Sequence, residues 1–277
     1  MTDTTPGAID CFGLTDQGRV REANEDHFVI ASMRKSVRIR HTSLTRPDLA
    51  DRFGGPEAFL FAVADGVGGR PGGQLASGTT VETLVDYVNQ ASGWFHSLDV
   101  DQEDVLLGRL EKTVLDAHER IKREHAGAGK APATTLTLTM LVWPRAYIIH
   151  VGDSRAYYLR RGRLQQITRD QTVGEFMVNI GAWTEAQGAK AGGALTSAIG
   201  SSELTPSVGL IDLEPGDVVL LCTDGLTKHL PDDRIAAVLG RPAGAEAMCR
   251  ELVAAALEAG GSDNVTTVVA RMSGPDA

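Results

Sequence analysis

Residues 59–66 read FLFAVADG, six consecutive apolar residues that run directly into an acid and a glycine. A continuous apolar run of this length predicts a strand that is buried on both faces. Residues 218–225 repeat the arrangement as VVLLCTDG, and residues 265–270 form a third run, VTTVVA. The chain therefore contains several central strands, and two of them end in an aspartate.

Acids stand at the ends of four apolar runs. Asp65 and Asp224 follow the first two runs, Asp153 follows the run at 148–151, and Asp263 stands just ahead of the run at 265–270. A single Asp-Gly after a strand is most often a turn. If these four strand ends converge, however, the carboxylates repel one another unless cations neutralise them. The pattern therefore predicts a cation site.

Residues 18–26 read GRVREANED and add a second group of charged side chains. Arg21 stands five residues ahead of Asp26, with Glu25 between them. A guanidinium close to carboxylates most often forms a salt bridge, but it is also a fork for a phosphate dianion. Oxygen ligands without interleaved His or Cys favour magnesium, manganese or calcium, and no compact DxDxDG calcium loop is present. A dispersed set of carboxylates is typical of a two-metal phosphohydrolase.

Hairpin signals predict antiparallel sheets. The predicted strands are 59–64, 135–142, 147–151, 157–160, 164–167, 218–222 and 265–270. Helical periodicity predicts helices at 75–88, 105–121, 171–180 and 245–257, and in the second of these Leu106, Leu110, Val114, Leu115, His118 and Ile121 share one face. Residues 32–56 and 182–193 are expected to be surface loops. The pattern predicts an α+β sandwich of two sheets with helices outside, in a single domain over 9–272 with flexible termini at 1–8 and 273–277.

Charge and cysteine content exclude several classes of protein. The 277 residues carry a net charge of −9, which disfavours a nucleic-acid binder. The three cysteines form no CxxC pair, and no apolar run has the length of a membrane span. We therefore expect no nucleic acid and no membrane among the partners, and a cytoplasmic location.

Seven motifs, in this order, carry a resemblance to a known family. They are TDQGRVREANED (15–26), VADGVGG (63–69), TTLT (134–137), VGDSR (151–155), TRD (168–170), TDGL (223–226) and GSDNVT (261–266). The set closely resembles the PPM, or type 2C, metal-dependent serine/threonine protein phosphatases, in their bacterial style. The resemblance covers 9–272 and implies an antiparallel β-sandwich flanked on both sides by helices, in four layers α-β-β-α.

The resemblance also implies roles for individual residues around two divalent cations, manganese or magnesium. Asp65 would bridge the two ions, with the Gly66 carbonyl on one of them. Asp224 and Asp263 would be ligands of the second ion. Glu25 and Asp26 would serve the first ion, partly through water. Asp153 with Asp224 would hold a third, weaker ion. Arg21 would hold the substrate phosphate.

The activity that the resemblance implies is hydrolysis of phosphoserine and phosphothreonine. A hydroxide bound between the metals would attack phosphorus directly, and the metals and Arg21 would offset the charge of the phosphoryl oxygens. The expected partners are phosphorylated proteins and a serine/threonine kinase that the enzyme opposes, and the expected state is a monomer. The alternatives are a non-catalytic regulatory module of the same fold, a phosphatase of small phosphoesters, and a nuclease.

The chain departs from the family pattern at four places. Eukaryotic members often carry a histidine shortly after the bridging Asp-Gly, where this chain has Val67, Gly68 and Gly69, so the leaving-group acid is left unassigned. Ala133 replaces a frequent glycine. Lys228 stands where many relatives carry an acid, which alters the charge around the site. The segment 32–56 is longer than in minimal bacterial members, and its basic residues are expected to form a solvated loop.

Overall fold

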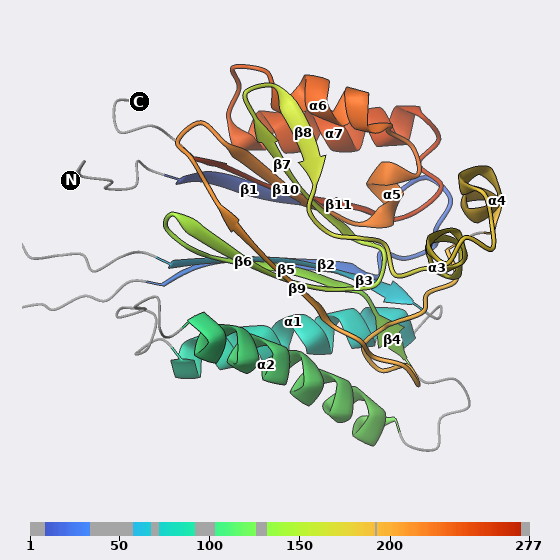
Figure 1. Ribbon diagram of the computed structural model, residues 1–277. Coiled ribbons are helices and arrows are strands. Elements are labelled where there is room, and N and C mark those ends of the chain that lie inside the picture. Colours follow the sequence, from blue (N-terminus) through green and yellow to red (C-terminus); the bar gives the residue numbers. More distant parts are fainter. Residues whose placement is uncertain are drawn as a thin grey trace, which may run out of the picture.

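Two antiparallel sheets pack face to face in this protein, and helices cover the outer face of each (Figure 1). The computed structural model describes residues 9–33, 58–67, 72–91, 103–125, 132–191 and 193–272. The predicted flexible termini, 1–8 and 273–277, and all of the predicted loop 32–56 except its first two residues lie outside the described residues. The four-layer α-β-β-α arrangement is the predicted fold class.

One sheet has five strands in the order β1-β11-β10-β7-β8. Each neighbouring pair in it is antiparallel. Its strands are β1 (Ile9–Asp16), β7 (Arg155–Arg160), β8 (Arg163–Gln166), β10 (Val218–Cys222) and β11 (Val265–Met272).

The other sheet has six strands in the order β2-β3-β5-β6-β9, with β4 beside β3, and is also antiparallel. Its strands are β2 (Asp26–Met33), β3 (Ala58–Val67), β4 (Ala133–Thr134), β5 (Leu136–Val142), β6 (Arg145–Val151) and β9 (Ser207–Asp212).

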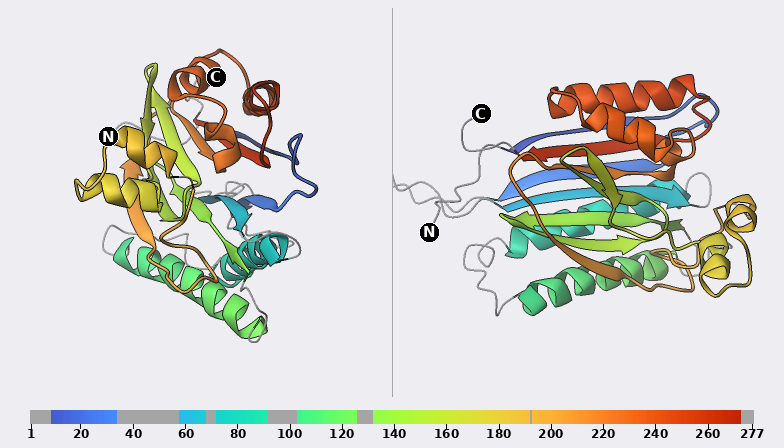
Figure 2. Two further views of the ribbon diagram at one scale, coloured as in Figure 1. Left: turned by 90° about the vertical axis from the view of Figure 1, so that its right-hand side faces the viewer. Right: turned by 45° about the horizontal axis from the view of Figure 1, so that its top comes forward.

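Two pairs of helices form the outer layers, and three short helices lie at one end of the sandwich (Figures 1 and 2). The outer helices are α1 (Gly72–Ala91) and α2 (Glu103–Glu124) on the six-stranded sheet, and α6 (Asp232–Leu239) and α7 (Ala245–Glu258) on the five-stranded sheet. The short helices are α3 (Val173–Asn179), α4 (Glu185–Lys190) and α5 (Asp224–Thr227). No described helix is long and apolar enough to cross a membrane.

The alternation along β3 explains why it lies at the centre of the fold. Phe59, Phe61 and Val63 point into the core between the two sheets, where they meet residues of β10 and β11. Leu60 and Ala62 point the other way, into the core under α1 and α2. A third core lies between the five-stranded sheet and α6 and α7. Both faces of β3 are therefore buried, as the continuous apolar run predicted.

The structure corrects two details of the sequence prediction. Leu115 is 43% exposed, and Thr113 and Ala117 complete the buried face of α2 instead. The reason is the helical period, because Leu115 lies about 100° around the axis from the buried Val114. The expected loop 182–193 contains the helix α4, which begins with a capping box between Thr184 and Gln187.

Besides α4, six elements were not predicted: β1, β2, the two-residue β4, β9, α5 and α6. The strands β1, β2 and β9 are outermost in their sheets, and their residues are mostly half-buried or exposed. Edge strands of this kind carry mixed polar and apolar residues without the long apolar runs of β3 and β10. The helices α5 and α6 span four and eight residues, too short for a clear helical period.

Candidate functional site

Strand alternation places two of the predicted site residues between the sheets. Asp65 follows Phe61 and Val63 on the same face of β3, so its side chain points to the interior of the sandwich where that interior ends. Asp26, the first residue of β2, is the register partner of Asp65. Two carboxylates thus face each other at the end of the sandwich, in a position where continued alternation predicts apolar residues.

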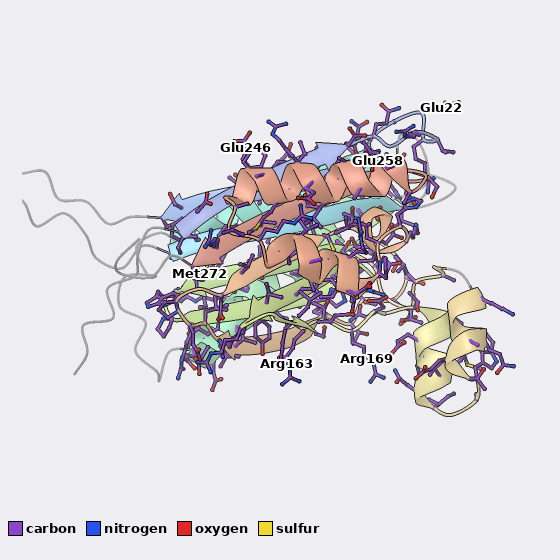
Figure 3. The ribbon with its side chains drawn as sticks, turned by 90° about the horizontal axis from the view of Figure 1, so that it is seen from above. Glu22, Arg163, Arg169, Glu246, Glu258 and Met272 are labelled. Carbon is purple, nitrogen blue, oxygen red and sulfur yellow. The ribbon has the colours of Figure 1, made fainter. Side chains whose placement is uncertain are left out.

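A cavity of about 380 Å³ opens at this end of the molecule. Its lining residues are Arg21, Glu25, Asp65, Gly66, Val67, Asp153, Gly193, Leu195, Asp224, Lys228, Asp263 and Asn264. Glu22, which neighbours Arg21, and the α3–α4 pair lie at this end, and Met272 lies at the opposite end (Figure 3). Every predicted site residue lines the cavity except Asp26, which is only 4% exposed behind it.

Asp26 is a buried carboxylate with hydrogen bonds to only one of its two oxygens. Its Oδ2 atom accepts hydrogen bonds from the Thr223 hydroxyl at 2.8 Å and from the Thr266 hydroxyl at 2.7 Å. Its Oδ1 atom is buried and has no hydrogen-bond partner among the described residues. Burial raises the pKa of Asp26 to about 7, although the two threonine hydrogen bonds oppose the rise. An unpartnered buried carboxylate oxygen is costly, and a cation would satisfy it.

Asp65 is a buried carboxylate surrounded by other acidic side chains. Burial raises its pKa well above the usual value, and the charges of Asp26, Asp224 and Asp153 raise it further. Its backbone is fixed from β4, because the Thr134 hydroxyl donates to the Asp65 carbonyl at 2.8 Å. The fold therefore holds Asp65 rigidly among other carboxylates, a position that cations would stabilise.

Asp263 is paired with two cations. Arg21 donates to it through Nε at 2.7 Å and through Nη2 at 2.8 Å, and Lys228 Nζ lies 2.7 Å from its Oδ2. Burial alone would raise the pKa of Asp263, but the hydrogen bonds from Arg21 and Lys228 hold it below the usual value. Hydrogen bonding to Asp263 in turn raises the pKa of Arg21.

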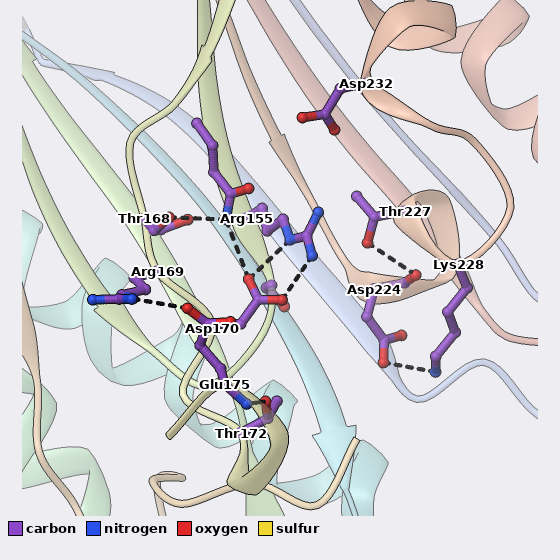
Figure 4. Close-up of polar contacts among 12 residues, drawn as sticks. Arg155, Thr168, Arg169, Asp170, Thr172, Glu175, Asp224, Thr227, Lys228 and Asp232 are labelled. Carbon is purple, nitrogen blue, oxygen red and sulfur yellow. Dashed lines mark hydrogen bonds and ion pairs between the residues drawn. The ribbon is translucent and has the colours of Figure 1, made fainter. Parts of the chain in front are cut away.

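Asp224 begins α5, directly after β10. Its Oδ2 lies 2.6 Å from Lys228 Nζ, one helical turn later, and its Oδ1 is buried with no hydrogen-bond partner among the described residues (Figure 4). Gly225 allows this turn to approach β11, since a Cβ there would lie 1.8 Å from the Asn264 carbonyl oxygen. The Asp-Gly pair at 224–225 therefore does more than turn the chain: it brings Asp224 beside Asp263.

Glu25 and Gly66 approach each other through their backbones. The Gly66 amide donates to the Glu25 carbonyl at 3.2 Å, and the Ser77 hydroxyl of α1 donates to the same carbonyl at 2.6 Å. A Cβ on Gly66 would lie 2.4 Å from the carbonyl of Gly73, so only glycine fits between β3 and the start of α1. The Gly66 carbonyl and the Glu25 carboxylate thus belong to one tightly packed corner.

Asp153 lies in the turn after β6. Burial raises its pKa to about 7, and the charges of Asp224 and Asp170 add to the rise while Lys228 lowers it. Gln171 holds the turn from both sides, since its amide donates to the Gly152 carbonyl at 2.7 Å and its side-chain oxygen accepts from the Gly152 amide at 2.9 Å. The segment around Asp170 and Gln171 therefore positions Asp153.

The sequence did not reveal the ion pair between Arg155 and Asp170 that supports this turn. Arg155 donates to Asp170 through Nε at 2.8 Å and Nη2 at 2.7 Å (Figure 4). It also donates through Nη1 to the Tyr157 hydroxyl at 2.9 Å. Desolvation lowers the pKa of Arg155, but the hydrogen bonds and charge interactions with Asp170 and Tyr157 together raise it above the usual value. The motifs VGDSR and TRD contained both partners, but nothing in their spacing indicated that Arg155 and Asp170 pair with each other.

Asn264 is a second positioning residue that the sequence did not reveal. Its side-chain amide donates to the carbonyls of Gln17 and Ala23, each at 2.8 Å, and its Oδ1 accepts from the Glu25 amide at 2.9 Å. These three bonds join the loop that carries Arg21 to the start of β11. This buried amide therefore helps to position Arg21 and Glu25 relative to Asp263, together with the Arg19 amide, which donates to the Gly261 carbonyl at 2.7 Å.

The donor set of the cavity fits hard divalent cations. All candidate ligands present oxygen, and both Asp26 and Asp224 keep one buried carboxylate oxygen unpartnered. No three His, Cys, Asp or Glu side chains of the described segments already form a group that could hold one ion. Asp263 and Asp224 face Arg21 and Lys228 instead, so ion binding requires these two cationic side chains to move or to share oxygens.

Comparison with known proteins identifies relatives of the whole sandwich. The family model described as protein phosphatase 2C matches residues 40–259. This range contains Asp65, Gly66, Asp153 and Asp224 and excludes the other four predicted site residues. The chain is also 34% identical over 221 residues to the serine/threonine protein phosphatase PstP of Mycobacterium tuberculosis, covering 77% of this chain. It spans only 40% of the length of that relative.

Solved structures agree with the sequence matches. The serine/threonine phosphatase of S. agalactiae superimposes with a TM-score of 0.77 at 25% identity, over 96% of this chain and 100% of that one. The catalytic domain of PstP, solved in complex with two manganese ions, gives a TM-score of 0.74 at 28% identity, over 96% and 99% of the two chains. The fold is therefore shared with these phosphatases over nearly the whole chain.

Proposed function

The chain belongs to the protein phosphatase 2C family, and on that premise we propose that it hydrolyses phosphoserine and phosphothreonine in proteins. One observation carries the proposal: Asp65, Asp224, Asp263 and Arg21 converge on a single cavity although they are far apart in the sequence. Carboxylates beside a guanidinium suit a cation-assisted reaction of a phosphate dianion.

We propose that two divalent cations, manganese or magnesium, bind at this end of the sandwich. Asp65 would contact both, the Gly66 carbonyl and Glu25 would serve one, and Asp224 and Asp263 the other. Asp26, which is buried behind the cavity wall, would contribute to the first ion, partly through water. Asp153 with Asp224 would hold a third, weaker ion. Bound there, the cations would make water a nucleophile for in-line attack on phosphorus and offset charge on the phosphoryl oxygens. The manganese complex of a related catalytic domain supports this assignment.

The residues of the cavity wall argue against a serine or cysteine nucleophile. Among the described lining residues there is no Ser, Cys or His that could serve as a nucleophile or its base. Cys222, which is close in sequence to Asp224, is fully buried, and burial raises the pKa of its thiol to about 12. A thiolate nucleophile is therefore disfavoured, which is consistent with the proposed direct attack by water.

Arg21 is the proposed phosphate ligand. Its side chain is 54% exposed and lines the cavity, while Asp263 fixes it through two hydrogen bonds. A guanidinium that is oriented by one carboxylate is prepared to receive a second anion. A substrate phosphate would thus meet Arg21 at the cavity mouth and lie directly over the carboxylates.

We further propose that the substrates are phosphorylated proteins, that the enzyme opposes a serine/threonine kinase, and that it works as a monomer in the cytoplasm. The names of the relatives as serine/threonine protein phosphatases support the substrate class. The net charge of −9 argues against a nuclease, because a polyanion would be repelled.

A substrate panel tests the proposal. Phosphoserine and phosphothreonine peptides, nucleotides, a small aryl phosphate and DNA are each incubated with the protein and manganese. We expect hydrolysis of the aryl phosphate and the phosphopeptides, lost in Asp65→Asn and Asp224→Asn and retained in the matched surface variant Asp116→Asn. Cleavage of DNA or of nucleotides alone would refute the assignment, and no hydrolysis of any substrate would favour the non-catalytic module.

A further inference from the structure

The ammonium group of Lys228 contacts two carboxylates that the proposed function assigns to a metal ion. Its Nζ is 2.6 Å from Asp224 Oδ2 and 2.7 Å from Asp263 Oδ2 (the Asp224 contact is drawn in Figure 4). These two acids are the pair that the proposed function assigns to one of the two cations. The inference below therefore rests on the proposed function and concerns a residue that is not part of the proposed ligand set.

The backbone around Lys228 is fixed by its neighbours. Lys228 caps α5, with its amide donating to the Asp224 carbonyl at 2.8 Å, and the flanking Leu226 and Leu230 are buried. The next residue, His229, accepts through Nε2 from the Ser262 amide at 2.9 Å. One turn of helix and the loop before Asp263 thus hold the lysine backbone, and only the side chain is free to rearrange.

The side chain of Lys228 has room to leave the carboxylates. It is 42% exposed and lines the cavity, whereas Asp224 and Asp263 are only 17% and 14% exposed. A long, flexible ammonium at the solvent boundary can withdraw into water while the acids stay in place. The ion pairs of Lys228 with Asp224 and Asp263 can therefore break and re-form, unlike an ion pair that is buried in the core.

The charges at this point are already balanced without a divalent ion. Asp263 receives Arg21 on both oxygens and Lys228 on one of them, and Asp224 receives Lys228 on the oxygen that faces Asp263. A divalent ion that coordinates both acids has to displace the ammonium or bind beside it. Either way, repulsion between the ion and the ammonium at such short range weakens metal binding by about tenfold or more.

We propose that Lys228 is a tethered cation that competes with a divalent ion for the Asp224–Asp263 carboxylate pair. One metal position is then intrinsically weak, while Asp65, Glu25 and the free oxygen of Asp26 are untouched by the lysine. Occupancy of the weak position depends on the concentration of divalent cations. Lys228 is thus a determinant of metal affinity.

Manganese binding measured by calorimetry, and by the electron paramagnetic resonance signal of free Mn²⁺, tests this competition. The proteins are the wild type, Lys228→Met, Lys228→Arg and the control Lys112→Met, whose lysine pairs with Asp116 on the surface of α2 and whose loss changes the net charge equally. We expect the ion at the Asp224–Asp263 pair to bind at least about tenfold more tightly to Lys228→Met than to the wild type. Lys228→Arg and Lys112→Met are expected to match the wild type.

A melting experiment supplies a second readout that does not need activity. Without metal, Lys228→Met leaves Asp224 facing Asp263 without the ammonium, so its melting temperature is expected to fall below that of the wild type. Added manganese is expected to raise it by more than it raises the wild type, because the gain grows with the ratio of ion concentration to Kd. Lys228→Gln serves as a second variant if the methionine protein does not fold without metal.

The outcomes separate this inference from the proposed function. Unchanged or weaker manganese binding by Lys228→Met, with normal binding by the wild type, overturns the competition and leaves the proposed function intact. A raised KM for an aryl phosphate at unchanged metal affinity also overturns it, because Lys228 would then be a phosphate ligand. Absence of manganese binding from the wild type and every variant overturns both.

Discussion

Asn264 offers a sharp test of how the site is positioned, because its side-chain amide makes three of the hydrogen bonds between two segments that carry site residues. It is 6% exposed and makes three hydrogen bonds, two to the carbonyls of Gln17 and Ala23 and one from the Glu25 amide. The change Asn264→Ala removes all three. It also leaves the partner groups without their hydrogen bonds in a partly buried corner.

The expected cost follows from the number of bonds. Each hydrogen bond contributes about 1 kcal/mol net, so Asn264→Ala is expected to lower the free energy of unfolding by about 3 kcal/mol. The loop with Arg21 and Glu25 also loses part of its attachment to the start of β11. We expect kcat/KM for an aryl phosphate to fall by at least about tenfold in the protein that remains folded, because misplaced catalytic groups are costly.

Urea denaturation without metal gives the first number, and manganese-dependent hydrolysis well below the unfolding midpoint gives the second. Asn179→Ala is the matched control, since Asn179 is exposed on α3 and contacts Arg169 at the surface. The control is expected to stay within about 0.5 kcal/mol of the wild type. If Asn264→Ala does the same and keeps full kcat/KM, the argument that this amide positions Arg21 and Glu25 is wrong.

Three further predictions concern the surroundings of the site. Asp170→Asn leaves Arg155 partly buried beside a neutral partner, and we expect a loss of about 3 kcal/mol in urea unfolding, with part of it restored in Arg155→Met/Asp170→Asn. Gly73→Ala places a Cβ 2.7 Å from Glu25 Oε2 and displaces that carboxylate, so calorimetry is expected to show weaker manganese binding. The control Gly108→Ala has open space at its Cβ and is expected to stabilise α2 by up to about 1 kcal/mol. Burial lowers the pKa of His150 to about 4 from 6.5, so the unfolded chain binds the extra proton. Stability from this residue is complete above pH 6.5 and is lost as the pH falls towards 4, by about 3 kcal/mol, and His150→Gln is expected to flatten that part of the pH profile of unfolding.

The central strands and the main acids could be predicted from the sequence because burial on both faces leaves an unmistakable pattern. In β3 every residue from Ala58 to Ala64 is buried, and the run stops at Asp65, where alternation puts a carboxylate among apolar positions. The apolar run of β10 indicated Asp224 in the same way. A local pattern was enough in these places because the burial of a central strand is visible in its own consecutive residues.

What the sequence could not give is the set of long-range pairings. Asn264 contacts Gln17, and Arg155 pairs with Asp170, across distances in sequence that no periodicity covers. The pairing of Lys228 with Asp263 is of the same kind, since it depends on how closely α5 approaches β11. The edge strands β1 and β2 were also missed, because partial exposure dilutes the pattern that identified β3.

The central claim is that the acids at this end of the sandwich hold divalent cations, with Asp65 shared between two of them. Anomalous X-ray scattering from crystals grown with manganese measures this directly. We expect two anomalous peaks within coordination distance of the Asp65 carboxylate in the wild type, and loss of both in Asp65→Asn crystals of the same fold. Peaks that persist in Asp65→Asn, or wild-type crystals with no manganese at Asp65, would contradict the claim.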